Sequence, residues 1–194
     1  MDSLLKFASA IDSVNTRVGR AVSVLILAMT LVSALNALSR KLFSVSSNAF
    51  LEAQWYLFAA VFLLAAGYTL LRNGHVRVDV VHAHLAARTR LWIELAGTLL
   101  FLIPFTVLVI RYGWPYFLDS VANREVSLNA GGLAVWPVKL LIPLGFLLLL
   151  LQAISQVVKV IGALQGRLPE QAVTTTTAQQ EELDERLRAP VRDA

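Results

Sequence analysis

Four long apolar stretches without a charged residue dominate the chain, and most of its polar residues lie between or beyond them. The stretches are bounded by Arg20 and Arg40, Glu52 and Arg72, Glu94 and Arg111, and Lys139 and Lys159. A helix rises 1.5 Å per residue, so about 20 apolar residues cross the roughly 30 Å hydrocarbon core of a bilayer. The pattern therefore predicts an all-α membrane protein with four transmembrane helices. We expect these helices at residues 21–38, 53–71, 91–110 and 135–158.

Composition agrees with a membrane protein. Hydrophobic residues make up 57% of the 194 residues and charged residues 15%, whereas a soluble domain carries about 25% charge. No apolar stretch has a charge at its midpoint, where it would cost at least about 2.5–3.5 kcal/mol. The net charge of +4 reflects basic residues flanking the spans, so we expect no nucleic-acid partner. The chain has no cysteine, which excludes disulfides, thiolate metal sites and iron–sulfur clusters.

The distribution of Lys and Arg around the spans predicts the orientation of the chain. Cytoplasmic loops of membrane proteins carry the excess of these residues. One side of the predicted membrane region receives Lys6, Arg17, Arg20, Arg72, Arg77, Arg88, Arg90, Lys159 and Arg167, and the other only Arg40, Lys41, Arg111, Arg124 and Lys139. Both termini and the loop between the second and third spans are therefore expected in the cytoplasm.

The chain divides into three predicted regions. Residues 1–20 have apolar positions at helical spacing, such as Leu4, Phe7 and Ile11, which predicts an amphipathic helix on the membrane surface. A helical extension of the first span would explain that pattern equally well. Residues 21–165 form the four-helix transmembrane domain. Residues 166–194, rich in Thr, Gln and Glu, are expected to be a polar, disordered cytoplasmic tail.

The cytoplasmic loop after the second span holds every histidine of the chain. Gly74 is expected to end the second helix, and His75 and Asp79 would lie one turn apart if helix resumes there. With His82 and His84, these residues could bind a metal or relay protons. A polar elbow, with Asp79 paired or capping a helix, is the simpler interpretation. We expect no catalytic site, because no further base or nucleophile accompanies them, and no metal or other cofactor.

Four further residues stand at the opposite ends of the predicted helices. Arg40 and Glu52 flank the short loop between the first two spans and are predicted to form an ion pair that fixes this connection. Lining a water-filled path is the alternative role for such charges. Trp136 and Pro137 open the fourth span. They are equally consistent with an anchor at the membrane surface and with a binding surface for another protein.

Features that membrane enzymes and carriers need are missing from the sequence. There is no Walker-type glycine loop for ATP hydrolysis, and no glycine-rich interruption or charge in the middle of a span, from which secondary transporters build substrate sites. Four helices are also too few for paired inverted repeats. We therefore expect no substrate site in this chain.

In the order of its motifs, the chain resembles the small membrane subunit (the DctQ-type or Q component) of tripartite ATP-independent periplasmic (TRAP) transporters. The resemblance covers about residues 14–164. Its most specific element is Gly74-His75-Val76-Arg77-Val78-Asp79. The others are residues 36–40 followed by Phe43, Glu52 at the start of the second span, and the run from Trp136 to Phe146 with Gln152 beyond it.

The resemblance implies a scaffold subunit in the bacterial inner membrane. Its partners would be a large membrane subunit, which holds the sodium and substrate sites and moves as an elevator, and a periplasmic binding protein that delivers an organic acid. Glu125, Ser127 and Trp136 are then candidates for contact with the binding protein. A redox anchor that binds quinone or haem is the alternative, although the three histidines lie outside the spans where axial ligands are needed. A small exporter that forms homodimers is the third possibility.

Overall fold

The computed structural model describes residues 2–44, 47–74, 85–169 and 173, apart from the side chain of residue 87. These parts of the chain are helical, with no strand beyond one isolated bridge between Val126 and Ala134. The helices are α1 (Asp2–Phe43), α2 (Asn48–Leu71), α4 (Ala87–Gly97), the π-helical segment η1 (Thr98–Leu102), α5 (Ile103–Ala122) and α6 (Trp136–Leu164). Four helices are long and apolar enough to cross a membrane, the third being α4, η1 and α5 together. The prediction of four membrane-spanning helices is confirmed.

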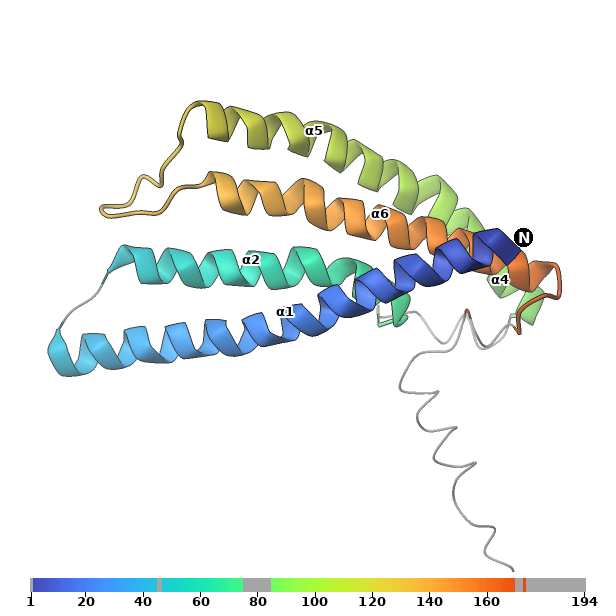
Figure 1. Ribbon diagram of the computed structural model, residues 1–194, viewed down its shortest axis with the longest axis horizontal. Coiled ribbons are helices and arrows are strands. Elements are labelled where there is room, and N and C mark those ends of the chain that lie inside the picture. Colours follow the sequence, from blue (N-terminus) through green and yellow to red (C-terminus); the bar gives the residue numbers. More distant parts are fainter. Residues whose placement is uncertain (1, 45–46, 75–84, 170–172, 174–194) are drawn as a thin grey trace, which may run out of the picture.

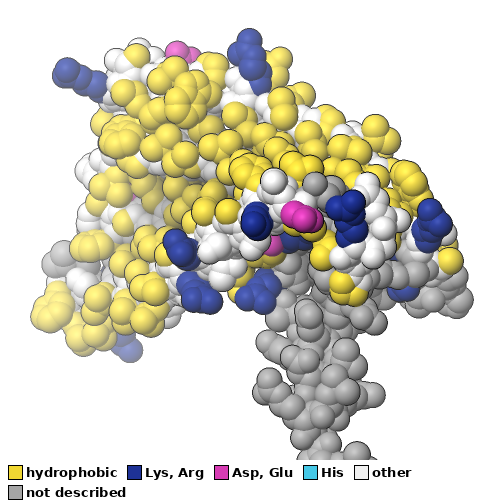
Figure 2. Space-filling model, turned by 45° about the vertical axis from the view of Figure 1, so that its right-hand side comes forward, with side chains coloured by type: hydrophobic (Ala, Val, Ile, Leu, Met, Phe, Trp, Pro, Cys, Tyr) yellow, Lys and Arg dark blue, Asp and Glu magenta, His cyan; other side chains and the backbone are white. Residues whose placement is uncertain are grey.

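The long helices lie side by side in a single layer in the order α1, α2, α6, α5 (Figure 1). Helix α6 packs against α2 on one side and α5 on the other, and α1 crosses it near the N-terminus. We call the end of the layer with the loops 44–48 and 123–135 the hairpin end, and the opposite end, which holds the N-terminus, the N-terminal end. Figure 2 shows a broad hydrophobic surface over the helices, with Lys and Arg side chains gathered at the N-terminal end.

Helix α1 is a single uninterrupted helix of 42 residues. At 1.5 Å per residue it is about 60 Å long, roughly twice the thickness of a hydrocarbon core. Residues 2–20 therefore extend the first span, and their amphipathic pattern is used in part for packing within the layer. Ala8, Ile11 and Asn15 are buried, whereas Leu4 and Phe7 are exposed. That the exposed side lies on a membrane surface stays a prediction.

The third span is longer than predicted and changes its hydrogen bonding in the middle. It runs from residue 87 to residue 122, and the N–H of Ile103 bonds to the carbonyl of Thr98, five residues earlier. Pro104 follows directly. Because its ring has no N–H and crowds the preceding turn, a local π-helical turn is one way to accommodate it. Pro137 lies in the first turn of α6, as predicted, and Pro143 lies within α6 without ending it.

The end of α2 corrects one prediction. Asn73, with φ of 50°, takes the left-handed conformation, and the N–H of Gly74 bonds to the carbonyl of Thr69 at 2.9 Å. Asparagine tolerates this conformation better than most residues and commonly follows a helix. The turn that ends α2 is therefore made by Asn73, and Gly74 only completes it.

Glycines allow the helices of the layer to approach closely. A β-carbon on Gly145 of α6 would lie 2.6 Å from the backbone oxygen of Leu63 in α2. At Gly67 of α2 it would collide with the Asn15 side chain of α1. Interfaces between membrane helices use such small residues because lipid supplies no hydrophobic force between the helices, so close packing has to hold them.

Candidate functional site

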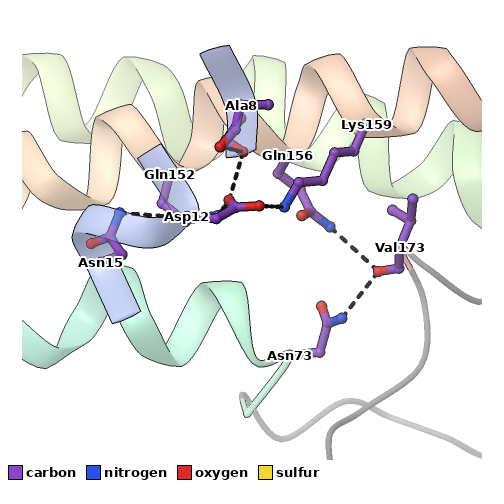
Figure 3. Close-up of polar contacts among 9 residues, drawn as sticks. Ala8, Asp12, Asn15, Asn73, Gln152, Gln156, Lys159 and Val173 are labelled. Atoms are coloured by element: carbon purple, nitrogen blue, oxygen red, sulfur yellow. Dashed lines mark hydrogen bonds and ion pairs between the residues drawn. The ribbon is translucent and has the colours of Figure 1, made fainter. Parts of the chain in front are cut away.

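A polar network ties α1 to α6 at the N-terminal end of the layer, and Asp12 is its centre (Figure 3). One carboxylate oxygen of Asp12 lies 2.5 Å from the ammonium nitrogen of Lys159. The other accepts hydrogen bonds from the Gln152 amide at 2.9 Å and from the Ser155 hydroxyl at 2.8 Å. All the donors come from successive turns of α6, so one acidic side chain of α1 holds two turns of the neighbouring helix.

The network continues into the interior through two amide side chains. Asn15 lies one turn after Asp12 on α1 and donates to the Gln152 side-chain oxygen at 2.8 Å. Asn15 is 1% exposed and Gln152 0%. Within the described parts of the chain the carboxamide oxygen of Asn15 has no hydrogen-bond partner, and it faces Gly67 of α2. Three helices therefore meet at these polar groups, and their geometry specifies how α1 crosses the layer.

The chemistry of this network is structural rather than catalytic. Both carboxylate oxygens of Asp12 are engaged by Lys159, Gln152 and Ser155. Buried polar groups that are paired in this way fix the position of the elements that carry them.

A second network, at the hairpin end, surrounds Glu52 in the first turns of α2. Its carboxylate accepts hydrogen bonds from the Ser127 hydroxyl, from the Asn129 amide at 2.7 Å and from the backbone N–H of Leu133 at 2.6 Å. Glu52 is 3% exposed. One carboxylate of α2 thereby binds the loop 123–135 at three of its residues. The Asn48 side chain adds a bond to the Ala130 carbonyl at 3.1 Å.

The two ends of the same loop are joined by an ion pair. The ammonium group of Lys139, on α6, donates to the Glu125 carboxylate and lies 3.9 Å from the ring centroid of Tyr116 on α5. The hydrogen bond from Lys139 holds the pKa of the Glu125 carboxyl below its usual range. The backbone N–H of Val135 also bonds to the Glu125 carbonyl at 3.0 Å. Helices α5 and α6 are thus joined where the loop leaves and re-enters the layer.

The predicted ion pair between Arg40 and Glu52 is wrong. Among the described residues Glu52 forms no bond to Arg40, which is exposed. The physical reason is that the loop 127–133 supplies three uncharged donors that enclose the carboxylate. A hydroxyl, an amide and a backbone N–H together satisfy a carboxylate without a cation.

The remaining predicted residues fall into two groups. Glu125 and Ser127 are engaged within the chain, by Lys139 and Glu52 respectively, while Trp136 is half-exposed at the start of α6. His75 and Asp79, together with His82 and His84, lie outside the described residues. In the parts of the chain that are described, no group of His, Asp and Glu could hold a metal ion. The predicted absence of a metal therefore stays a prediction, because the histidines are not among them.

Reasoning from the sequence missed the network around Asp12. A signal for it was present on α6, where Gln152, Ser155, Gln156 and Lys159 recur at helical spacing in an otherwise apolar helix. Polar residues placed in this way on one face of a membrane helix indicate a polar partner on a neighbouring helix.

Comparison with known proteins completes the description. Neither the curated proteins nor the solved structures give a match. A protein-family model does match, over residues 29–163, and it describes the DctQ component of tripartite ATP-independent periplasmic transporters. The matched region contains the last third of α1, the whole of α2, α4, η1 and α5, and all but the last residue of α6. The chain therefore belongs to the DctQ family, the small-subunit component of TRAP transporters.

Proposed function

We propose that this protein is the scaffold subunit of a sodium-coupled transporter that takes up an organic acid across the bacterial inner membrane. A large membrane subunit would carry the sodium and substrate sites, and a periplasmic binding protein would deliver the solute. This chain would take no part in solute chemistry and would hold no cofactor. Its family membership is the observation that carries the proposal, and the match covers the second and third spans, nearly all of the fourth and the last part of the first.

The arrangement of the helices supports a role as a wall beside a larger partner. Helix α5 packs mainly on α6, and α1 packs on α2 and crosses α6, so large parts of α1, α2 and α5 stay exposed. Examples are Trp55, Phe58 and Phe62, which follow one face of α2. A partner that packed on such a face would find a surface already fixed by the networks around Asp12 and Glu52. A rigid surface of this kind suits a part that stays still while its partner moves.

The loop 123–135 is the part of the chain that we assign to contact with the binding protein. Arg111 marks the end of the charge-free stretch of α5, and the helix continues to Ala122, about 16 Å further at 1.5 Å per residue. The loop after it therefore lies beyond the hydrocarbon region. It presents Leu128 fully exposed at its tip, next to the exposed Val126. An exposed apolar side chain on a loop that hydrogen bonds hold in place favours contact with another protein.

Uptake and assembly measurements test the proposal together. Cells that lack this chain should lose sodium-dependent uptake of the organic acid, and the tagged chain should co-purify with the large subunit. Liposomes that contain this chain alone should show no solute flux. Undiminished uptake after deletion would overturn the scaffold role, and flux through the chain alone would favour the exporter. A haem band in a reduced-minus-oxidised spectrum would favour the redox anchor.

The absence of cysteine makes the orientation measurable. A single cysteine at Leu128 should react with a membrane-impermeant maleimide from the periplasmic side, and one at Ser3 or Arg167 only after the membrane is opened. Reaction of the cysteines at residues 3 and 167 on opposite sides would contradict the proposal that both termini are cytoplasmic.

A further inference from the structure

Beyond the two networks, one residue of the predicted tail is packed into the N-terminal end of the layer. Val173 is 1% exposed, although it follows the end of α6 by nine residues. Its side chain joins a cluster with Leu91 and Leu95 of α4 and Val160 of α6. This depth of burial is unexpected for a residue of a polar tail. A surface of the bundle is shaped to receive it.

The backbone of Val173 is held as specifically as its side chain (Figure 3). Its carbonyl oxygen accepts a hydrogen bond from the Asn73 amide at 3.0 Å and another from the Gln156 amide at 3.5 Å. Asn73 and Gln156 are themselves buried, and they come from the end of α2 and from α6. Two amide donors from distant parts of the chain thus converge on one carbonyl oxygen.

Together these contacts have the two elements of a peptide-binding site. Peptide-binding sites hold the main chain of the ligand through hydrogen bonds and select its side chains with pockets. Here the amides of Asn73 and Gln156 bind the carbonyl, and Leu91, Leu95 and Val160 form the pocket. The pocket accepts a branched aliphatic side chain, because its walls are aliphatic and a charged group inside it would lose its hydration.

We propose that this site, the Val173 pocket, is a peptide-docking site whose occupant is the chain's own C-terminal segment. Occupied, it joins the end of α2, α4 and α6 through one residue. The consequence is that the C-terminal segment secures the N-terminal end of the layer, where the helices are also joined by Asp12. The proposal does not rest on the transport role, because it concerns contacts within this chain.

Thiol labelling of the full chain tests the occupant, since the protein has no cysteine of its own. We expect a cysteine at Val173 to react with a soluble maleimide at least about tenfold more slowly than one at Arg167, whose side chain is half-exposed. Both residues follow α6 in the same segment, so the comparison isolates docking. Equal rates at the two positions would overturn the proposal.

A second labelling experiment places the cysteine at a residue that lines the pocket. A cysteine at Leu91, which is buried in the wild-type arrangement, should react about tenfold faster when Val173→Asp is added. Pro169→Asp, which adds the same charge at an exposed position, should leave the rate unchanged. A cysteine at Leu149, buried in the separate cluster with Leu70 and Ala153, should stay protected in Val173→Asp, which shows that the layer remains folded. If the cysteine at Leu91 remained slow to react in Val173→Asp, something other than Val173 would cover the pocket, and the proposal would fail.

Discussion

The carboxamide oxygen of Asn15 occupies the space beside Gly67 where any other residue would carry its β-carbon. The amide nitrogen of the same side chain is bonded to Gln152, so Asn15 cannot rotate away without breaking that bond. A glycine of α2 and a polar residue of α1 are therefore matched in shape, and α6 fixes the orientation of the second.

Replacing Gly67 by alanine should destabilise the protein. The added methyl group would push Asn15 away from Gln152 or separate α1 from α2, and overpacking of this kind costs about 1–3 kcal/mol. Thermal unfolding in detergent measures the change. Gly97→Ala is the matched control, because a β-carbon there meets nothing within 4 Å. Equal unfolding temperatures for the two variants would show that the contact at Gly67 is not restrictive.

Loss of either charge in the pair of Asp12 and Lys159 should also destabilise the fold. Both side chains are mostly buried, and hydrogen bonds to charged groups contribute about 1.5–3 kcal/mol. We expect Asp12→Asn and Lys159→Met each to lower the free energy of unfolding by an amount in that range. The double variant should lose less than the sum, because the second change removes a charge already left unpaired.

An exposed ion pair provides the control for this comparison of single and double variants. Asp2 lies 4.0 Å from Arg167, and both side chains face solvent. Asp2→Asn should change the free energy of unfolding by less than about 0.5 kcal/mol, as exposed pairs usually do. If the changes at Asp12 and Lys159 were additive, their proximity would contribute nothing to stability.

Replacing Glu52 by glutamine should loosen the loop 123–135. Glutamine keeps one acceptor oxygen but presents an amide to donors that need a second one, so at least the bond from the Leu133 N–H is lost. Trypsin cleavage after Arg124, within this loop, should become several-fold faster. Ser127→Ala, which removes one of the three donors, should give a smaller increase. An unchanged cleavage rate in Glu52→Gln would contradict the assigned role.

The pair of Glu125 and Lys139 predicts a dependence on pH. The folded state holds the pKa of Glu125 below its usual value, which is about 4.3 in an unfolded chain. The pair therefore contributes stability at all pH values above about 4.3, and this contribution is lost as the pH falls through the lower folded pKa. The melting temperature should accordingly be higher for wild type than for Glu125→Gln at pH 7, and the difference should shrink below pH 4.

A neighbouring carboxylate is the control for this prediction. Asp119 is exposed at the end of α5, and Asp119→Asn should change the melting temperature little at either pH. A difference between wild type and Glu125→Gln that persisted unchanged in acid would show that the charge of Glu125 is not the cause.

The membrane spans could be predicted because their signal is repeated along each segment. About 19 residues without a charge between Arg20 and Arg40 leave few alternatives to a membrane helix. Small residues in a membrane helix are typical of close packing, and the structure shows such a contact at Gly67. An apolar pattern that extends over about 20 positions stays recognisable when one position departs from it.

The contacts that hold the spans together depend on single residues and could not be predicted in the same way. Asp12 and Lys159 are 147 positions apart, and nothing in the local pattern of either identifies the other. The sequence singled out Glu52 as a partner of Arg40, but its partners lie in a loop whose conformation follows from hydrogen bonds rather than from periodicity. Arg40 is an opposite charge across the short loop from Glu52, and proximity in sequence was the wrong guide.

The position of α6 has a consequence for biosynthesis. This helix leaves the ribosome last, yet it supplies the surface against which both α2 and α5 rest. Helices α1 and α2 can pair as soon as they are inserted, whereas α5 must wait in the lipid without its main neighbour. The nascent protein therefore becomes a single packed unit only when its final span arrives, and truncation within that span would leave α2 and α5 without the helix that packs between them.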